Sequence, residues 1–307
     1  MTNIVPGHLC KTTTNDRQKT LKMTRIFTLS ASIAVTLSVL ILTGCGTGSD
    51  AEIDISDDQW HETDTLESDP EVDPAEEVEW SLEFLTGRFD PSTHPDFEEI
   101  NPEWASREGM FLHREALEAF SRMRKEAEEA GIELIIRSAT RNFENQKRIW
   151  EEKWEGSRLS AGVNAKKIYP DPVDRAKNIL LFSAMPGTSR HHWGTEVDLN
   201  SFDNSWFETG EGLVLYNWLM ENAIRFGFCQ PYTEKGPERP TGYSDEKWHW
   251  SFVPLSKKMT RDAEILMTDE KISGFKGAET AREIGIIENY VLGINPGCLD
   301  EIKLDEL

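Results

Sequence analysis

Two short segments of this chain are rich in side chains that bind metal ions. They are residues 189–198, SRHHWGTEVD, and residues 246–249, EKWH, which follow about fifty residues later. Imidazole and carboxylate groups are preferred ligands of zinc, and a catalytic zinc site uses three of them and keeps a fourth position for water. His191, Asp198 and His249 would supply such a set. The sequence therefore predicts a His-Asp-His zinc site.

Glu246 stands close to His249 in the chain, so its carboxylate can reach water at the metal without being a ligand. There it would take a proton from the water and later give it to a leaving amine. The chain has no HExxH helix, which excludes the zincin arrangement. His191 and His192 are adjacent, so only one of them can easily be a ligand. We expect His191 to bind and His192 to pack.

Each of these residues also has a simpler interpretation. Asp198 could cap the end of a strand, and Glu246 could be a solvated loop charge. Arg141, which lies upstream of both segments, could be a surface ion-pair partner. The tryptophans near the second segment could belong only to the hydrophobic core.

The segments must be positioned by neighbouring helices and strands. Helical spacing of apolar residues and capping signals predict helices, and short β-branched or alternating runs predict strands. Helices interleaved with strands favour a single α+β domain. The predicted helices are 112–130, 142–154, 173–182, 211–226, 256–267 and 276–291, and the predicted strands are 133–136, 195–200 and 248–253.

Three motifs together resemble a known family. Residues 189–198 match SxHxxGxAxD, residues 246–249 match ExxH, and residues 138–146 match Ser-x-x-Arg-(x)4-Gln. These are motifs of the VanY-type D-alanyl-D-alanine carboxypeptidases, zinc peptidases with a hedgehog-like fold. The resemblance covers roughly residues 110–255 in the family's order. It implies one hedgehog or D-Ala-D-Ala peptidase-like domain, with a small antiparallel sheet flanked by helices.

The resemblance also implies roles for individual residues. His191, Asp198 and His249 would bind Zn2+, and Glu246 would be the general base. Arg141 would lie near the scissile carbonyl and either stabilise the oxyanion or hold a substrate carboxylate.

Two further residues, Ser189 and Gln146, would contact the substrate. The sequence departs from the family pattern at Glu196, where the motif usually has Ala. Residues 196 and 198 of a strand face the same side, so the Glu196 carboxylate could lie near the metal.

The implied reaction is hydrolysis of the terminal D-Ala-D-Ala bond of peptidoglycan stem peptides. An L,D-carboxypeptidase or a murein endopeptidase with the same motifs is an alternative. A non-catalytic, zinc-stabilised module that binds the cell wall is another. The net charge of -22 argues against a nucleic-acid partner, and the sequence does not indicate an oligomeric state.

The N-terminal part is predicted to direct export. Residues 1–44 read as a lipoprotein signal peptide, with a possible true start at Met23, and the Leu-Thr-Gly-Cys run resembles a lipobox ending at Cys45. An uncleaved membrane anchor is the alternative. We expect a lipid-anchored protein of the cell envelope, at the outer membrane or the periplasmic face if the host is Gram-negative.

The remaining boundaries follow from charge and cysteines. Residues 50–79 contain fourteen Asp or Glu and no Lys or Arg, so residues 45–79 are predicted to be a lipidated, disordered acidic tether. The zinc peptidase domain is predicted over 80–268 and a C-terminal helical extension over 269–307. Cys229 and Cys298 could form a disulfide or remain two buried thiols.

Overall fold

A computed structural model describes residues 78–302 of the chain. The predicted signal peptide, the predicted lipidation site Cys45 and nearly all of the predicted acidic tether fall on residues 1–77, outside the described residues. No helix within 78–302 is both long enough and apolar enough to cross a membrane. The first described residues pack on the rest of the domain, because the backbone N–H groups of Glu79 and Trp80 donate to the buried Asp262 carboxylate.

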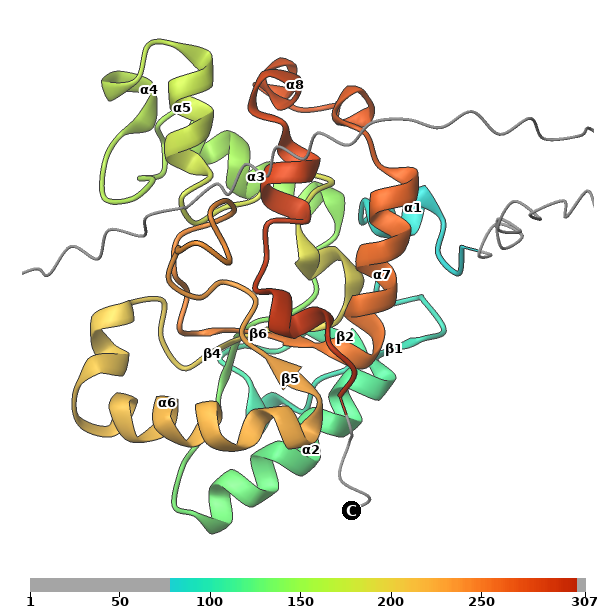
Figure 1. Ribbon diagram of the computed structural model, residues 1–307, viewed down its shortest axis with the longest axis vertical. Helices are drawn as coiled ribbons and strands as arrows, with labels where there is room; N and C mark the ends of the chain where they lie inside the picture. The colour runs from blue at the N-terminus through green and yellow to red at the C-terminus, as the bar shows by residue number, and fades with distance from the viewer. Residues whose placement is uncertain (1–77, 303–307) are drawn as a thin grey trace, which may run out of the picture. The chain divides into compact units, whose positions relative to one another are not determined.

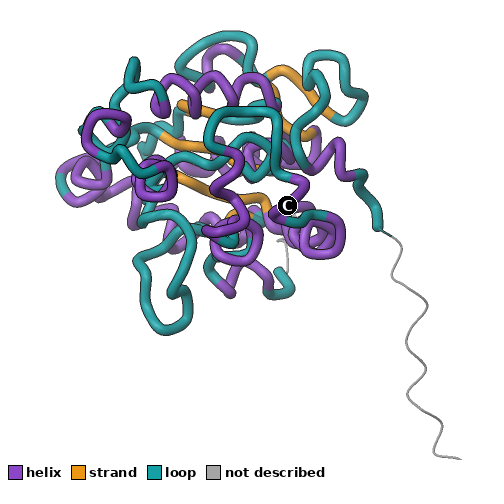
Figure 2. The backbone as a smooth tube through the Cα atoms, turned by 90° about the horizontal axis from the view of Figure 1, so that it is seen from above, coloured by secondary structure: helices purple, strands orange, loops and turns teal. Residues whose placement is uncertain are grey.

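A four-stranded antiparallel sheet lies in the interior of the domain, with helices around it (Figures 1 and 2). Its strand order is β3-β4-β6-β5, so the two strands that carry the metal-ligand motifs are neighbours. All four residues of β4 and of β6 are buried, which places polar side chains of these strands inside the protein. The strands are β3 (Ile136–Ser138), β4 (Glu196–Leu199), β5 (Phe228–Cys229) and β6 (His249–Phe252).

A second, two-stranded antiparallel sheet joins β1 (Phe97–Glu99) to β2 (Phe111–His113). It is linked to the metal-ligand region through the backbone, since His113 N–H donates to the carbonyl of Gly194 at 3.0 Å.

Helices gather on opposite sides of the larger sheet. Figure 1 shows α2 and α6 on one side and α3, α4, α5 and α8 on the other. The α-helices are α1 (Leu82–Leu85), α2 (Arg114–Glu129), α3 (Phe143–Trp154), α4 (Ala165–Ile168), α5 (Pro172–Ile179), α6 (Gly210–Asn222), α7 (Val253–Leu266) and α8 (Ala281–Ile284). Short 3-10 segments are Pro102–Trp104, Arg190–Trp193, Asn204–Glu208, Ala223–Phe226, Asp269–Lys271, Ala278–Thr280 and Pro296–Leu299, and a π-helical turn spans Ile287–Val291.

Local sequence signals explain where several helices begin. The Asn142 side chain accepts a hydrogen bond from the N–H of Asn145, as predicted for the cap of α3. Asp171 caps α5 in the same way, and Pro172 occupies the first turn, where no N–H is needed.

Some observed helices and strands differ from the predicted ones, because strand pairing or backbone conformation sets their bounds. The predicted helix 112–130 starts later, because residues 111–113 pair with β1. The predicted strand 133–136 is displaced to 136–138, where the backbone meets β4. The predicted helix 276–291 is interrupted at Gly285, whose φ of 64° lies in the left-handed region.

The segment 269–302, predicted as an extension, packs on the same core as the rest of the described chain. Ile284, Ile286 and Val291 are buried in that core. Cys298 forms a disulfide with Cys229 of β5, with the two Cα atoms 5.5 Å apart. The structure thus decides between the disulfide and the two free thiols.

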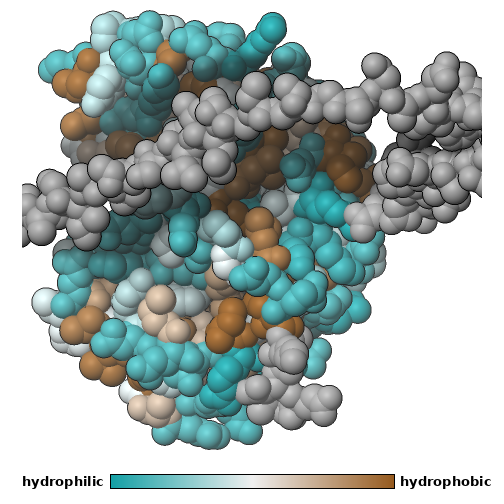
Figure 3. Space-filling view, in the orientation of Figure 1, coloured by the Kyte–Doolittle hydropathy of each residue, from teal (hydrophilic) through white to brown (hydrophobic). Residues whose placement is uncertain are grey.

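The surface is mostly polar on the face shown in Figure 3, with apolar residues in separate patches. One group of exposed apolar side chains belongs to α6 and the turn after it: Leu213, Val214, Met220 and Ile224.

Candidate metal centre

The sheet places one row of polar side chains across three strands. In the strand register, Ser138 of β3 lies opposite Asp198 of β4, which lies opposite His249 of β6. Directly opposed residues of antiparallel strands present their side chains on the same face. Asp198 and His249 are therefore brought together by strand pairing, although they are far apart in the sequence.

His191 reaches the same place from the 3-10 turn that precedes β4. Gly194 ends this turn with a φ of 74°, and a Cβ atom there would lie 2.3 Å from the Phe97 ring. Glycine is thus required both for the backbone conformation and for the close packing. The chain then enters β4, and the His191 side chain lies beside that of Asp198.

The three predicted ligands present their donor atoms to one another. Asp198 Oδ2 lies 3.2 Å from His191 Nε2, and Asp198 Oδ1 lies 3.1 Å from His249 Nδ1. One ligand atom from each residue can be chosen so that all three lie within 4.8 Å of one another. All three residues are buried.

The other nitrogen of each imidazole already has an acceptor. His191 Nδ1 lies 2.8 Å from the carbonyl oxygen of Ala139, and His249 Nε2 lies 2.9 Å from Glu196 Oε2. A ring nitrogen that donates its proton to such an acceptor leaves the opposite nitrogen with a free lone pair. His191 Nε2 and His249 Nδ1 are then the ring atoms free to bind a metal ion.

The donor set fits a zinc ion. Asp198 Oδ1 is buried and makes no hydrogen bond, so it has the unmet need for a partner that a cation would satisfy. Two oriented imidazoles and one carboxylate make up a typical catalytic zinc set and leave a position open.

Charge and burial affect the ligands in different ways. Burial and, to a smaller extent, the nearby Arg141 lower the pKa of His191 to about 4, which favours the neutral ring that a metal needs. Burial alone would raise the pKa of Asp198, but the adjacent imidazoles of His191 and His249 hold it well below its usual value. Burial also opposes protonation of His249, whereas its contacts with Asp198, Glu196 and Glu246 raise its pKa.

Glu246 lies beside the donor set, just before β6. Its Oε2 is 3.4 Å from His249 Nδ1, and its backbone is fixed by hydrogen bonds to Tyr232 and Gln230. Burial raises the pKa of the Glu246 carboxyl. A buried carboxylate with a raised pKa can accept and return a proton near neutral pH.

Arg141 points its guanidinium at the same centre. Its Nη1 donates to Ser138 Oγ at 2.7 Å and lies 3.8 Å from Asp198 Oδ2, while its buried Nε has no hydrogen-bond partner. Its backbone N–H donates to the carbonyl of His191. The simpler prediction of a surface ion pair is wrong, because the side chain is mostly buried beside Asp198.

A cavity of about 540 Å³ opens onto these residues. The predicted substrate contacts Ser189 and Gln146 both line it, together with all of the ligands, Glu246 and Arg141. Gln146 donates through Nε2 to the carbonyl of Ala184, and its buried Oε1 is left without a partner. That oxygen can accept a hydrogen bond from a bound molecule.

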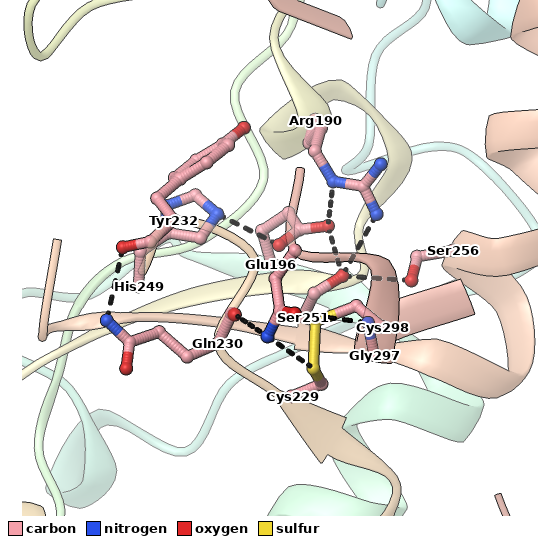
Figure 4. Close-up of a disulfide and its surroundings, with 11 residues drawn as sticks. Arg190, Glu196, Cys229, Gln230, Tyr232, His249, Ser251, Ser256, Gly297 and Cys298 are labelled. Atoms are coloured by element: carbon pink, nitrogen blue, oxygen red, sulfur yellow. Dashed lines mark hydrogen bonds and ion pairs between the residues drawn. A yellow bond between two sulfur atoms is a disulfide. The ribbon is translucent and has the colours of Figure 1, made fainter. Parts of the chain in front are cut away.

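The unusual Glu196 is connected to the site through His249. Figure 4 shows its carboxylate between His249 and Arg190: Oε1 accepts from Ser251 Oγ at 2.7 Å and from Arg190 Nε at 3.2 Å. Arg190 in turn donates to Thr260. Glu196 therefore lies near the predicted metal, as the strand alternation indicated, but it touches the far nitrogen of a ligand.

His192 is directed away from the donor set. Its Nδ1 lies 2.5 Å from the carbonyl oxygen of Arg141, and its Nε2 accepts from the N–H of Gly187. Burial lowers its pKa to about 3. The ring thus ties the Arg141 loop to the loop before the 3-10 turn.

Sequence reasoning missed other residues of the cavity. The Tyr232 ring packs against His249 in a tilted arrangement, with ring centroids 4.7 Å apart. Lys153 and Ser183 form a buried hydrogen bond in the wall of the cavity. The spacing of Lys153 seven positions after Gln146 on one helix face was the available signal.

The candidate metal site has three buried ligands, an adjacent glutamate that is not a ligand, and an opening to a cavity in an α+β domain. These are the features of a zinc-dependent hydrolase. The family model VanY, D-alanyl-D-alanine carboxypeptidase, matches residues 109–255. The chain belongs to the VanY family.

The chain is similar to individual curated proteins of two bacteria. A D-alanyl-D-alanine carboxypeptidase of Enterococcus faecalis is 35% identical over 125 residues, which are 41% of this chain and 42% of that protein. An uncharacterized protein of Haemophilus influenzae is 33% identical over 107 residues, 30% of this chain and 79% of that one. The chain spans about half the length of the curated relatives it matches, 42% and 62% for two of them.

A solved structure of VanYB in complex with D-alanine-D-alanine is 26% identical and aligns with a TM-score of 0.39, covering 57% of this chain and 87% of that one.

Proposed function

We propose that the protein is a zinc-dependent carboxypeptidase that removes the terminal D-alanine from D-Ala-D-Ala ends of peptidoglycan stem peptides. The observation that carries this proposal is the buried His191–Asp198–His249 donor set with the Glu246 carboxylate beside it in one cavity. The family match supports the choice of substrate.

The residues of the site divide the work of hydrolysis. His191, Asp198 and His249 would hold the zinc ion, which when bound polarises a carbonyl and lowers the pKa of water. Glu246 accepts the proton of the attacking water and returns it to the leaving amine. The Arg141 guanidinium faces the centre with an unpaired N–H, so it can stabilise negative charge that develops on the carbonyl oxygen.

Aromatic side chains form the mouth of the cavity. Phe182 and Phe202 are partly exposed and flank Trp248, with ring centroids 6.2 and 6.1 Å from it. Such a rim can hold the apolar parts of a peptide while the polar groups reach the centre.

We also propose that the protein is exported and anchored by a lipid on Cys45. The disulfide between Cys229 and Cys298 supports export, because disulfides persist in oxidising compartments. Metabolic labelling with a tagged fatty acid tests the anchor: the wild-type protein should carry the label and Cys45→Ala should not. Equal labelling of both would contradict the proposal.

Digestion of defined muropeptides tests the reaction. Mass spectrometry of a pentapeptide stem treated with the zinc-loaded protein should show loss of one alanine, and Glu246→Gln should show none. Cleavage of only tetrapeptide or cross-linked substrates would identify an L,D-carboxypeptidase or an endopeptidase instead. Binding to cell walls without any cleavage would identify a wall-binding module.

A further inference from the structure

Lys153 is a buried cation in the wall of the cavity that holds the candidate metal centre. It is 9% exposed and lies on α3, on the same helix face as Gln146 and Ile149, which also line the cavity. Its position is therefore fixed by a helix whose other face packs in the core through Trp150 and Trp154.

Among the described residues 78–302, Lys153 has no counter-ion. Its Nζ donates to Ser183 Oγ, and no carboxylate of residues 78–302 lies within ion-pair distance of it. The charges that act on it are mostly of like sign: burial, Arg158 and Arg141 lower its pKa to about 8, and only Glu246 opposes them. A buried ammonium without an anion is unfavourable.

A second buried cation, Arg190, does have a counter-ion in the protein. Arg190 is also buried, and it has the Glu196 carboxylate at 3.2 Å and two hydroxyl acceptors, Ser251 and Thr260. The protein therefore supplies a carboxylate for the buried Arg190 but none, among the described residues, for Lys153.

The Lys153–Ser183 pair has donors to spare. An ammonium has three N–H donors, and the hydrogen bond to Ser183 Oγ uses one of them. Because Ser183 accepts from Lys153, its own hydroxyl proton remains available. Both residues line the cavity, so these donors can meet the two oxygens of one carboxylate.

We propose that Lys153 and Ser183 bind a carboxylate of the peptide substrate, an inference that rests on the proposed function. Every carboxypeptidase substrate carries a free terminal carboxylate, whereas an internal peptide bond has none at that place. A cation that is satisfied only by this group favours cleavage at a free end over cleavage within a chain. A carboxyl group on a side chain of the stem is the second source of the same chemistry.

Substrates that differ in their carboxylates test the inference. The peptide diacetyl-L-Lys-D-Ala-D-Ala has only its terminal carboxylate, and its C-terminal amide has none. We expect Lys153→Met to lower kcat/KM for the acid by about 10- to 100-fold, mainly through KM, because a charge-assisted contact is lost. Lys153→Arg should retain most of the activity, and the exposed Lys177→Met should match the wild type.

The amide and a longer stem peptide identify the source of the carboxylate. If the terminal carboxylate is bound, wild type and Lys153→Met should cleave the amide equally slowly. If a stem side-chain carboxyl is bound, the loss should appear only with stem peptides that contain one. Equal kinetics of wild type and Lys153→Met on every substrate would overturn the inference.

Binding measurements separate this inference from the proposed reaction. If the zinc-loaded wild type cleaves no peptide, the proposed function fails, and calorimetric titration with the acid and the amide then decides the inference alone. Tighter binding of the acid that disappears in Lys153→Met supports a carboxylate site. Equal affinities in both proteins contradict it.

Discussion

At the scale of single residues, the metal centre depends on the partners of its ligands as much as on the ligands. His191 is oriented by a backbone carbonyl, whereas His249 is oriented by a side chain, Glu196. A carboxylate that accepts from the far nitrogen of an imidazole fixes its tautomer and raises its basicity. Substitution at Glu196 should therefore affect metal binding even though Glu196 is not among the three ligands.

Glu196→Gln is predicted to weaken zinc binding by about 10-fold or more, because the amide keeps the shape but removes the charge. Competition with a chelator of known affinity measures this. The thermal midpoint of the metal-free protein, recorded in parallel, accounts for any loss of fold. An unchanged zinc dissociation constant would show that Glu196 only neutralises Arg190.

Glu196→Ala provides a second comparison. It leaves Arg190 as an unpaired buried charge and should lower the free energy of unfolding by about 3–5 kcal/mol. Adding Arg190→Met should recover a large part of this loss, since no unpaired charge then remains. Chemical denaturation of the three variants measures the difference, and a double variant no more stable than Glu196→Ala would contradict this explanation.

The ligands and Glu246 could be selected from the sequence because their types and order are distinctive. The structure brings His191, Asp198 and His249 together, in agreement with that selection. The direction of the Glu196 carboxylate could not be derived, since it depends on Arg190 and on Ser251 of the opposite strand. Alternation along a strand predicts the face of the sheet to which a side chain points, but not the residue that it contacts there.

At the scale of elements, α3 combines a structural face with a functional one. Its buried tryptophans hold it in the core, while Gln146 and Lys153 line the cavity. A buried charge such as Lys153, which has a hydrogen-bond acceptor but no counter-ion, should reduce stability, as is common at functional sites.

Lys153→Met is predicted to raise the free energy of unfolding at pH 7, by on the order of 2 kcal/mol, because it removes a buried charge. The pKa of Lys153 is lowered from 10.5 to about 8 in the folded state. Between these pH values the unfolded chain binds more protons, so the stability of the wild type should rise with pH across this window.

Urea denaturation at pH 7 and pH 10 measures both effects. The rise with pH should be smaller in Lys153→Met than in the wild type, with the exposed Lys177→Met as control. A less stable Lys153→Met at pH 7 would contradict the assignment of an unfavourable buried charge.

Helices with clear caps and apolar spacing could be predicted well, such as α3 with Asn142. The strands could be located only within a few residues, because pairing with distant segments decides which residues join the sheet. The short β1 and β5 were not predicted, since two or three residues carry too little pattern.

At the scale of the whole described domain, the C-terminal segment packs on the common core and is bonded to the larger sheet. Figure 1 shows it passing from α8 back to the edge strand β5, where the disulfide lies. The bond joins residues 69 positions apart in the sequence. A cross-link over such a distance restricts the unfolded chain and stabilises the folded one.

Replacement of Cys229 and Cys298 by Ala should lower the free energy of unfolding by about 2–5 kcal/mol. The thermal midpoint of the double variant under oxidising conditions, compared with reduced and oxidised wild type, measures this. Reduced wild type should resemble the variant. If reduction leaves the midpoint unchanged, the disulfide does not hold the segment.

The zinc content of the purified protein tests the central claim most directly. Mass spectrometry of the metal should find about one zinc per chain in the wild type and in Glu246→Gln, whose side chain is not a ligand. Asp198→Ala should lose most of the zinc after the same dialysis. A wild type without stoichiometric zinc, or an Asp198→Ala protein that retains it as tightly, would contradict the assignment of the site.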